Sequence, residues 1–123
     1  MGVLTAWLYA AALTVVIETA LLAVAGYRSR RFVAVCVCIN VATNVTLNVV
    51  LSVVSGALGF WPWGLVGVLE VVVVAVEWAV LRLVAGPGGR PVPIRARASV
   101  RLAGFVLLAN LASFTVGLFL YHP

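Results

Sequence analysis

The chain has 123 residues, of which 65% are hydrophobic and only 9% are charged. A soluble domain is usually about half apolar and about a quarter charged, so this composition excludes an ordinary soluble domain and favours an integral membrane protein. The net charge of +5 does not require nucleic acid, because arginines beside membrane spans fix topology and meet lipid headgroups. The lipid bilayer is therefore the expected partner, and no nucleic acid is expected.

Four apolar runs are long enough to cross a bilayer, since a helix needs about 20 apolar residues to span roughly 30 Å of hydrocarbon. Only short connectors separate them, which predicts one integral membrane domain over residues 1–123. We expect an all-α membrane protein whose four transmembrane helices form a compact bundle. The first run has no basic residue before it and is long for a signal peptide, so it is interpreted as a retained span. The predicted spans cover residues 4–26, 32–55, 65–84 and 100–121.

The three connectors differ in chemistry. Residues 27–31 (YRSRR) form a short basic turn. Residues 56–64 (GALGFWPWG) combine glycines, a proline and two tryptophans, which is typical of a turn at the level of the lipid headgroups, where indole rings prefer to lie. Residues 85–98 (AGPGGRPVPIRARA) are rich in glycine, proline and arginine and predict a loop.

The arginines indicate the orientation of the chain. All of them lie in the first or third connector or near a span end there, and the other ends of the spans carry none. Because short cytoplasmic loops are enriched in basic residues, we predict a multi-pass protein of the prokaryotic plasma (inner) membrane, with arginine-rich loops in the cytoplasm and both termini extracytoplasmic. The arginines are Arg28, Arg30, Arg31, Arg82, Arg90, Arg95, Arg97 and Arg101.

All three acidic residues, Glu18, Glu70 and Glu77, lie inside the predicted spans. An ionisable group at such depth costs about 2.5–3.5 kcal/mol on insertion scales, and it usually marks a functional site. Counting a rise of about 1.5 Å per residue from the arginine side places Glu70 about two turns above Glu77, near the midplane. The same count predicts one polar layer in the cytoplasmic half of the membrane, formed by Glu18, Asn40, Glu77 and Asn110.

A stripe of amides follows the second span. Asn40, Asn44 and Asn48 recur at every fourth residue and share one helix face, with Thr43 beside them. We interpret this stripe as one wall of a polar cavity, whose amides pair with the buried glutamates of the other helices. The alternative is that these groups, and hydroxyls such as Ser113, only hold helices together, at about 0.6–2 kcal/mol per contact.

The chemistry of the polar groups limits the ligand. Carboxylates, amides and hydroxyls are hard oxygen donors that suit protons, Na⁺, Mg²⁺, Ca²⁺ or Mn²⁺. The only histidine, His122, stands beside the C-terminus, so haem and catalytic zinc are not expected, and no cofactor is predicted. A bound metal ion would use Glu18, Glu70 and Glu77. No catalytic residue is assigned; the candidate substrate- or ion-binding residues are Glu18, Asn40, Thr43, Asn44, Glu70, Glu77 and Asn110.

A membrane carboxyl group that binds and releases protons can exchange them for a cation. We therefore expect a small integral membrane protein that binds and transports a cation or a small cationic solute, coupled to protons. One alternative is a non-transporting membrane subunit or assembly factor whose polar faces mediate helix–helix interaction. Another is an intramembrane enzyme using paired glutamates, although the chain has no buried histidine and no Gly-x-Ser-x-Gly elbow. A homo-oligomer or a partner membrane subunit is compatible with each of these readings.

In length, in its four spans and in the glutamate of its first span, Glu18, the chain resembles the small multidrug-resistance transporters. The resemblance is limited to architecture, because the sequence motifs around the glutamate of that family are absent and the strong arginine asymmetry favours a single orientation. Fluoride channels are similar in size, but the chain has no segment like TTFSTF.

Overall fold

The structure is a computed structural model that describes residues 2–121. Within that part the protein is all-helical, with four long helices, one short 3-10 turn and no strand. The elements are α1 (Val3–Val24), α2 (Arg30–Leu58), α3 (Trp63–Leu81), η1 (Pro87–Gly89) and α4 (Arg97–Tyr121).

The prediction of an all-helical chain with four long apolar helices is confirmed. Each of the four is long and apolar enough to cross a membrane. The helix bounds differ from the predicted spans by up to three residues at an end: α2 extends beyond its span at both ends, from Arg30 to Leu58, and α3 begins and ends earlier, at Trp63 and Leu81. The side chain of Ser29 caps its start by accepting a hydrogen bond of 3.1 Å from the backbone N–H of Phe32. Gly59, with a φ of 74°, ends the helix in the left-handed conformation that favours glycine.

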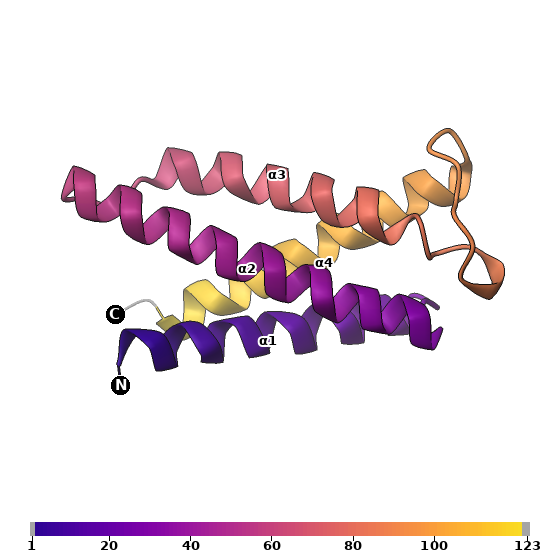
Figure 1. The fold of residues 1–123 in the computed structure, drawn as a ribbon, viewed down its shortest axis with the longest axis horizontal. Coiled ribbons are helices and arrows are strands. Elements are labelled where there is room, and N and C mark those ends of the chain that lie inside the picture. The colour runs from indigo at the N-terminus through magenta and orange to yellow at the C-terminus, as the bar shows by residue number, and fades with distance from the viewer. Residues whose placement is uncertain (1, 122–123) are drawn as a thin grey trace.

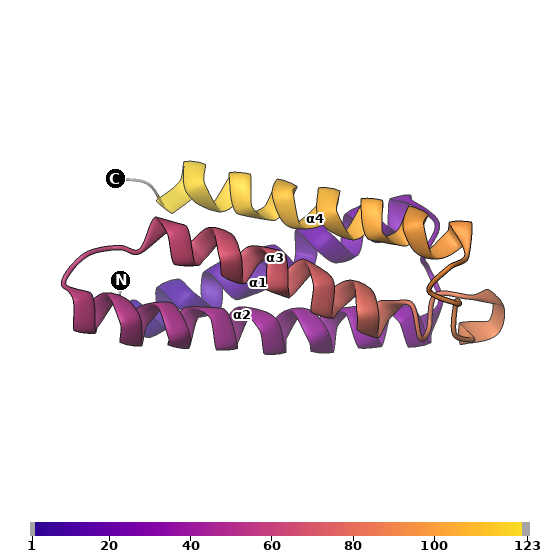
Figure 2. The same ribbon diagram turned by 90° about the horizontal axis from the view of Figure 1, so that it is seen from above.

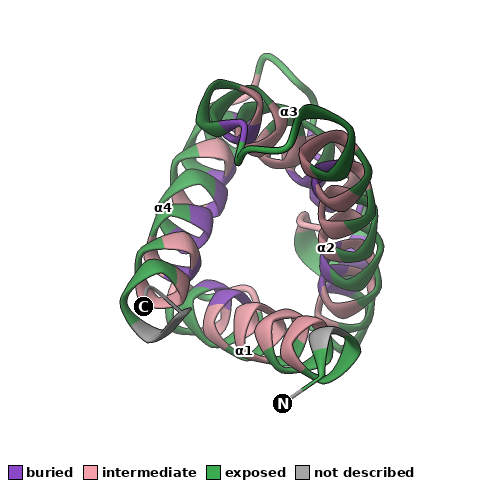
Figure 3. Cartoon of the chain, turned by 90° about the vertical axis from the view of Figure 1, so that its left-hand side faces the viewer, coloured by how far each residue is buried: buried purple, intermediate pink, exposed green. Residues whose placement is uncertain are grey.

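The four helices run lengthwise beside one another (Figures 1 and 2), and seen along the bundle they form a ring (Figure 3). The main contacts join α1 to α2, α2 to α3, α3 to α4 and α4 back to α1. The α1–α2 connector and the loop around η1 lie together at one end of the bundle, which we call the arginine end because it carries all eight arginines. The start of α1, the end of α4 and the α2–α3 turn with Trp61 and Trp63 lie at the opposite end, which we call the tryptophan end.

The arginine end has a packed apolar core. Phe32 stacks on Tyr27, with ring centroids 4.9 Å apart, and Trp78 donates a hydrogen bond of 3.0 Å from Nε1 to the backbone oxygen of Ser99. The first contact joins the α1–α2 connector to α2, and the second joins α3 to α4. The fully buried apolar side chains of this core are Leu22, Phe32, Cys36, Leu81, Leu102 and Val106.

The distribution of polarity across the bundle is the reverse of that in a soluble protein. Large apolar side chains such as Leu8, Val53, Val71 and Leu108 are exposed on the outer faces of the helices. The charged and amide residues Glu18, Asn40, Glu77 and Asn110 are buried instead. Figure 3, which looks along the bundle, shows the buried positions on the inner faces of the ring. Such an arrangement is stable where the surroundings are hydrocarbon rather than water.

Candidate functional site

Glu77 of α3 is the centre of a polar network inside the ring. Its side chain is only 1% exposed. Its Oε1 accepts a hydrogen bond of 2.8 Å from the hydroxyl of Thr43 on α2, and its Oε2 accepts one of 2.7 Å from the amide of Asn110 on α4. Glu77 therefore joins three of the four helices through its two carboxyl oxygens.

Glu18 of α1 completes the network, and it too is 1% exposed. Its Oε1 accepts a hydrogen bond of 2.9 Å from the hydroxyl of Ser113, which stands one turn after Asn110 on α4. Glu18 also lies next to Asn40 and Glu77. The two carboxyl groups and their partners thus form one cluster that involves all four helices.

Two oxygen atoms of this cluster have no hydrogen-bond partner although they are buried. They are Oε2 of Glu18 and the amide oxygen of Asn40. A buried polar atom without a partner costs about 1–3 kcal/mol. Both atoms are acceptors, so a proton on the carboxyl group, a water molecule or a cation would satisfy them, whereas another acceptor would not.

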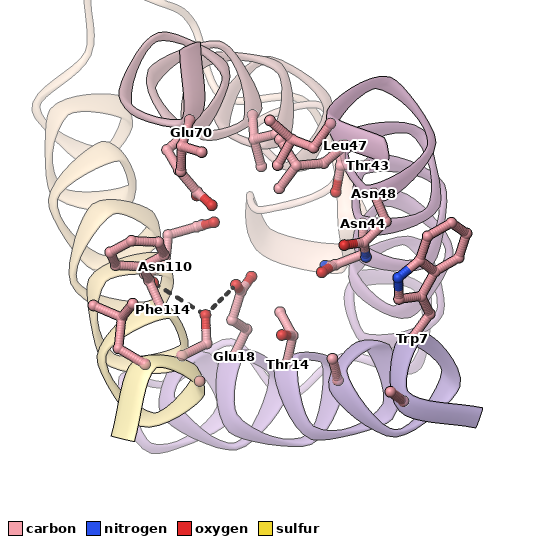
Figure 4. A pocket seen from close by; sticks show the side chains of 18 of the residues that line it. Trp7, Thr14, Glu18, Thr43, Asn44, Leu47, Asn48, Glu70, Asn110 and Phe114 are labelled. Carbon is pink, nitrogen blue, oxygen red and sulfur yellow. Dashed lines mark hydrogen bonds between the residues drawn. The ribbon is translucent and has the colours of Figure 1, made fainter. Parts of the chain in front are cut away.

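A cavity of about 590 Å³, which we call the vestibule, lies above this cluster on the side of the tryptophan end. Figure 4 shows side chains from the four helices pointing into it. Its floor carries the polar groups Glu18, Thr43, Asn110 and Ser113. Its walls carry Thr14, Asn44, Asn48 and Glu70.

The vestibule reaches one end of the bundle only. Trp7, Trp61, Trp63 and Leu118 line it near the tryptophan end, while the packed core described above fills the arginine end. No basic side chain of the described residues lines the vestibule. A solute entering from the tryptophan end therefore meets aromatic and apolar walls first and carboxyl groups last, which suits a positively charged ligand.

The seven candidate residues lie in or directly beneath the vestibule, at three positions. Glu77 and Asn40 lie beneath the vestibule and are buried. Glu18, Thr43 and Asn110 form its floor. Asn44 and Glu70 are half-buried in its wall, and Glu70 and Asn110 point into the cavity from neighbouring helices (Figure 4).

Two amides of the stripe on α2 bond to the backbone of their own helix. The amide nitrogens of Asn40 and Asn44 donate to carbonyl oxygens of their own helix, those of Cys36 and Asn40, each at 3.0 Å. Asn40 also lies next to Glu18, and the pairing of this stripe with the glutamates stays a prediction. On α2 it is Thr43 that bonds a glutamate, and Asn110 on α4 is the asparagine that does so.

Two lining residues that the sequence did not single out as candidates are Ser113 and Trp7. For Ser113 we expected only what is general for membrane hydroxyls, which is to hold helices together or to bond the backbone. It does contact the backbone oxygen of Asn110, at 3.0 Å. Its spacing of three residues from Asn110 places both on one helix face, and this signal would have found it. No comparable pattern marks Trp7.

The three glutamates do not form a carboxylate metal centre of the kind considered for a bound ion. Within residues 2–121, no group of three His, Cys, Asp or Glu side chains is close enough to hold a metal ion. The separation follows from the helix geometry, because Glu70 stands two turns from Glu77 and lies in the wall of the vestibule rather than beneath it.

Comparison of the chain with protein-family models, with curated proteins and with solved structures finds no match. The argument about function therefore rests on the geometry of the site itself.

Proposed function

We propose that the protein is a multi-pass protein of the prokaryotic plasma membrane that binds a cation or small cationic solute in the vestibule and transports it in exchange for protons. One observation carries this proposal. Glu18 and Glu77 are neighbouring buried carboxyl groups, and each contacts a hydroxyl group that can either donate or accept a hydrogen bond.

The hydroxyl partners allow each carboxyl group to gain or lose a proton at Oε1 without losing the hydrogen bond of that oxygen. When Glu77 is charged, Thr43 donates to it. When Glu77 carries a proton, the carboxyl group can donate to Thr43, whose own hydrogen then turns to the backbone oxygen of Ile39 at 2.9 Å. Ser113 can act in the same way between Glu18 and the backbone oxygen of Asn110. Both forms of each carboxyl group are served by rotation of one hydroxyl.

The closeness of the two carboxyl groups couples protons to cations. Two neighbouring carboxylates repel each other, so the cluster favours the presence of a positive charge, which is either a proton or a bound cation. Glu18 lies at the floor of the vestibule, where an arriving cation can replace the proton. In this proposal the vestibule opens to the extracytoplasmic side, since the arginine end is expected to be cytoplasmic. Transport then requires the packed arginine end to open during the cycle.

Flux in proteoliposomes tests the proposal. Uptake of Na⁺ and of tetramethylammonium, as ion and small-solute probes, is measured under an imposed pH gradient. We expect uptake to depend on the gradient and to be lost in Glu18→Gln and in Glu77→Gln. Thr46→Val is the control, because Thr46 is exposed and bonds only Ala42 of its own helix, at 2.8 Å. Uptake of either probe that is unchanged in both glutamine variants would overturn the proposal.

A second candidate function is favoured by the same network. Hydrogen bonds that join α1, α2, α3 and α4 would also stabilise a membrane subunit that transports nothing. Such a subunit would lose stability in the glutamine variants, would show no flux of its own, and would co-purify with a stoichiometric partner. Flux and thermal stability measured on the same variants therefore separate the two functions.

A further inference from the structure

A second cavity, of about 390 Å³, lies between α3 and α4 and opens on the outer surface of the bundle. We call it the lateral groove. Four apolar side chains, Val71, Val74, Leu107 and Leu111, line it together with Gly67, and none of these five lines the vestibule. The outer rim is exposed, with Val71 at 70%. In a bilayer the lateral groove would therefore face the hydrocarbon chains of the lipid.

The lateral groove and the vestibule meet between α3 and α4. They share five lining residues, which are Trp63, Val66, Glu70, Asn110 and Phe114. Glu70 and Asn110 are the only polar side chains among the residues that line the lateral groove, and both also face the vestibule. An apolar passage thus leads from the surrounding lipid to a carboxyl group and an amide at the edge of the polar site.

We propose that the ligand is an amphiphile with a cationic head and an alkyl chain, which enters sideways from the bilayer, with its head at Glu70 and Asn110 and its chain in the lateral groove. A purely water-soluble ion would gain nothing from an apolar groove that leads from the lipid-facing surface to a carboxyl group. An alkyl chain loses little on moving from lipid into such a groove, because both surroundings are equally apolar. The positive charge follows from the lining, since the described residues around both cavities include carboxyl groups and no basic side chain.

This inference rests on the proposed function in that it names the class of cation that the site takes. It differs in the route, because the lateral groove gives access from the membrane while the open tryptophan end gives access from water. The two can fail separately: a transporter of water-soluble cations would have no ligand in the lateral groove, and a protein that binds amphiphiles need not transport them.

Photo-crosslinking in lipid nanodiscs tests the inference. The probe is dodecyltrimethylammonium carrying a diazirine on its alkyl chain, and labelled residues are mapped by mass spectrometry. We expect saturable labelling at Val71, Leu107 and Leu111, in excess of the labelling at lipid-exposed positions of α1 and α2 such as Leu8 and Val53. A dodecanol probe with the same diazirine is the comparison for the charge, and it should label the lateral groove no more than it labels the rest of the outer surface.

Two variants sharpen the test. Gly67→Phe should fill the lateral groove and abolish the excess labelling, because Gly67 has open space around its Cβ position and does not line the vestibule. Gly104→Phe is the matched control, since Gly104 is an exposed helical glycine with the same open space and lines neither cavity. Glu70→Gln should weaken labelling about tenfold, as expected for the loss of one charge-assisted contact.

Three results would overturn the inference: labelling spread evenly over all four helices, equal labelling by the dodecanol probe, or labelling that persists in Gly67→Phe. Tetramethylammonium flux, measured as described above, then shows whether the proposed function has failed as well. Flux that depends on Glu18 and Glu77 without labelling of the lateral groove would keep the proposed function and remove the amphiphile. Saturable labelling of the lateral groove with no flux of Na⁺ or tetramethylammonium would keep the amphiphile and remove the proposed transport.

Discussion

The contact between Thr43 and Glu77 gives a sharp test of the buried network. In Thr43→Val the side chain keeps its shape, and only the hydroxyl is lost. Thr46→Val is the matched control, because both threonines stand on α2 and contact a carbonyl oxygen four residues earlier, at 2.9 Å for Thr43 and 2.8 Å for Thr46. The main difference between the two sites is the 2.8 Å hydrogen bond from Thr43 to Oε1 of Glu77. Thr43 is also half-buried and lies 3.2 Å from the backbone oxygen of Asn40, whereas Thr46 is exposed.

The expected effect on the free energy of unfolding follows from that difference. Thr43→Val leaves Oε1 of Glu77 without a donor, and an unsatisfied buried acceptor costs about 1–3 kcal/mol. Hydrogen bonds between membrane helices are often weaker, averaging about 0.6 kcal/mol with a maximum of about 1.7 kcal/mol. We therefore expect Thr43→Val to be less stable than Thr46→Val by about 1–1.5 kcal/mol, and Thr46→Val to lie within about 0.5 kcal/mol of the wild type.

Reversible unfolding by SDS in mixed micelles measures both free energies, with helix content followed by circular dichroism. A double-mutant cycle with Glu77→Gln isolates the interaction, because the effect of Thr43→Val should shrink once the carboxylate is absent. Equal stabilities of Thr43→Val and Thr46→Val, or a Thr43 effect that is independent of residue 77, would refute the reasoning.

Three further predictions concern other parts of the fold. Asn110→Leu should lower the free energy of unfolding by about 1–3 kcal/mol, since it leaves a buried carboxyl oxygen without its donor; chemical denaturation that detects no loss would contradict this contact. Gly59→Ala should destabilise by about 1 kcal/mol because its φ is 74°, whereas Gly56→Ala, inside α2 with open space at its Cβ position, should be neutral or stabilising by up to about 1 kcal/mol. The opposite order in thermal unfolding would show that α2 does not end where described. Leu102→Ala should lower the free energy of unfolding by about 2–5 kcal/mol, because Leu102 is fully buried in the core of the arginine end. The same substitution should speed the reaction of Cys36, in the same core, with a water-soluble maleimide. An unreactive Cys36 in that variant would argue against a continuous core.

The four helices and the meeting of Glu18 with Glu77 were accessible from sequence for geometric reasons. Long apolar runs with short connectors leave little choice but a helical bundle. The rise per residue is fixed, and both hairpins have their basic connectors at the same end, so counting from that end gives the depth of each polar group. The count placed Glu18, Asn40, Glu77 and Asn110 at one depth. In the structure Glu18 lies next to Asn40 and Glu77, and Asn110 bonds Glu77.

The pairing of individual groups was not accessible in the same way. Whether the amide of Asn40 reaches across to another helix or folds back to Cys36 depends on its rotamer and on the local distance between helices. The pattern of asparagines along α2 is the same in both cases. For that reason the sequence favoured amide donors from α2, where the structure has the hydroxyl of Thr43.

The lateral groove was likewise beyond the sequence. It depends on how widely α3 and α4 are separated near Gly67 and Leu107, and side-chain size along either helix does not determine that separation. Small residues are frequent in all four helices. Their positions therefore do not identify which two neighbouring helices leave a groove between them.

Proton release on cation binding tests the central claim most directly, which is that Glu18 and Glu77 together hold a proton that a cation displaces. The purified protein in weakly buffered detergent solution is mixed with saturating tetramethylammonium, and a pH indicator records the protons released per chain. The account predicts release by the wild type and by Thr46→Val, and none by the double variant Glu18→Gln with Glu77→Gln. Binding of tetramethylammonium without proton release by the wild type, or release that persists in the double variant, would contradict it.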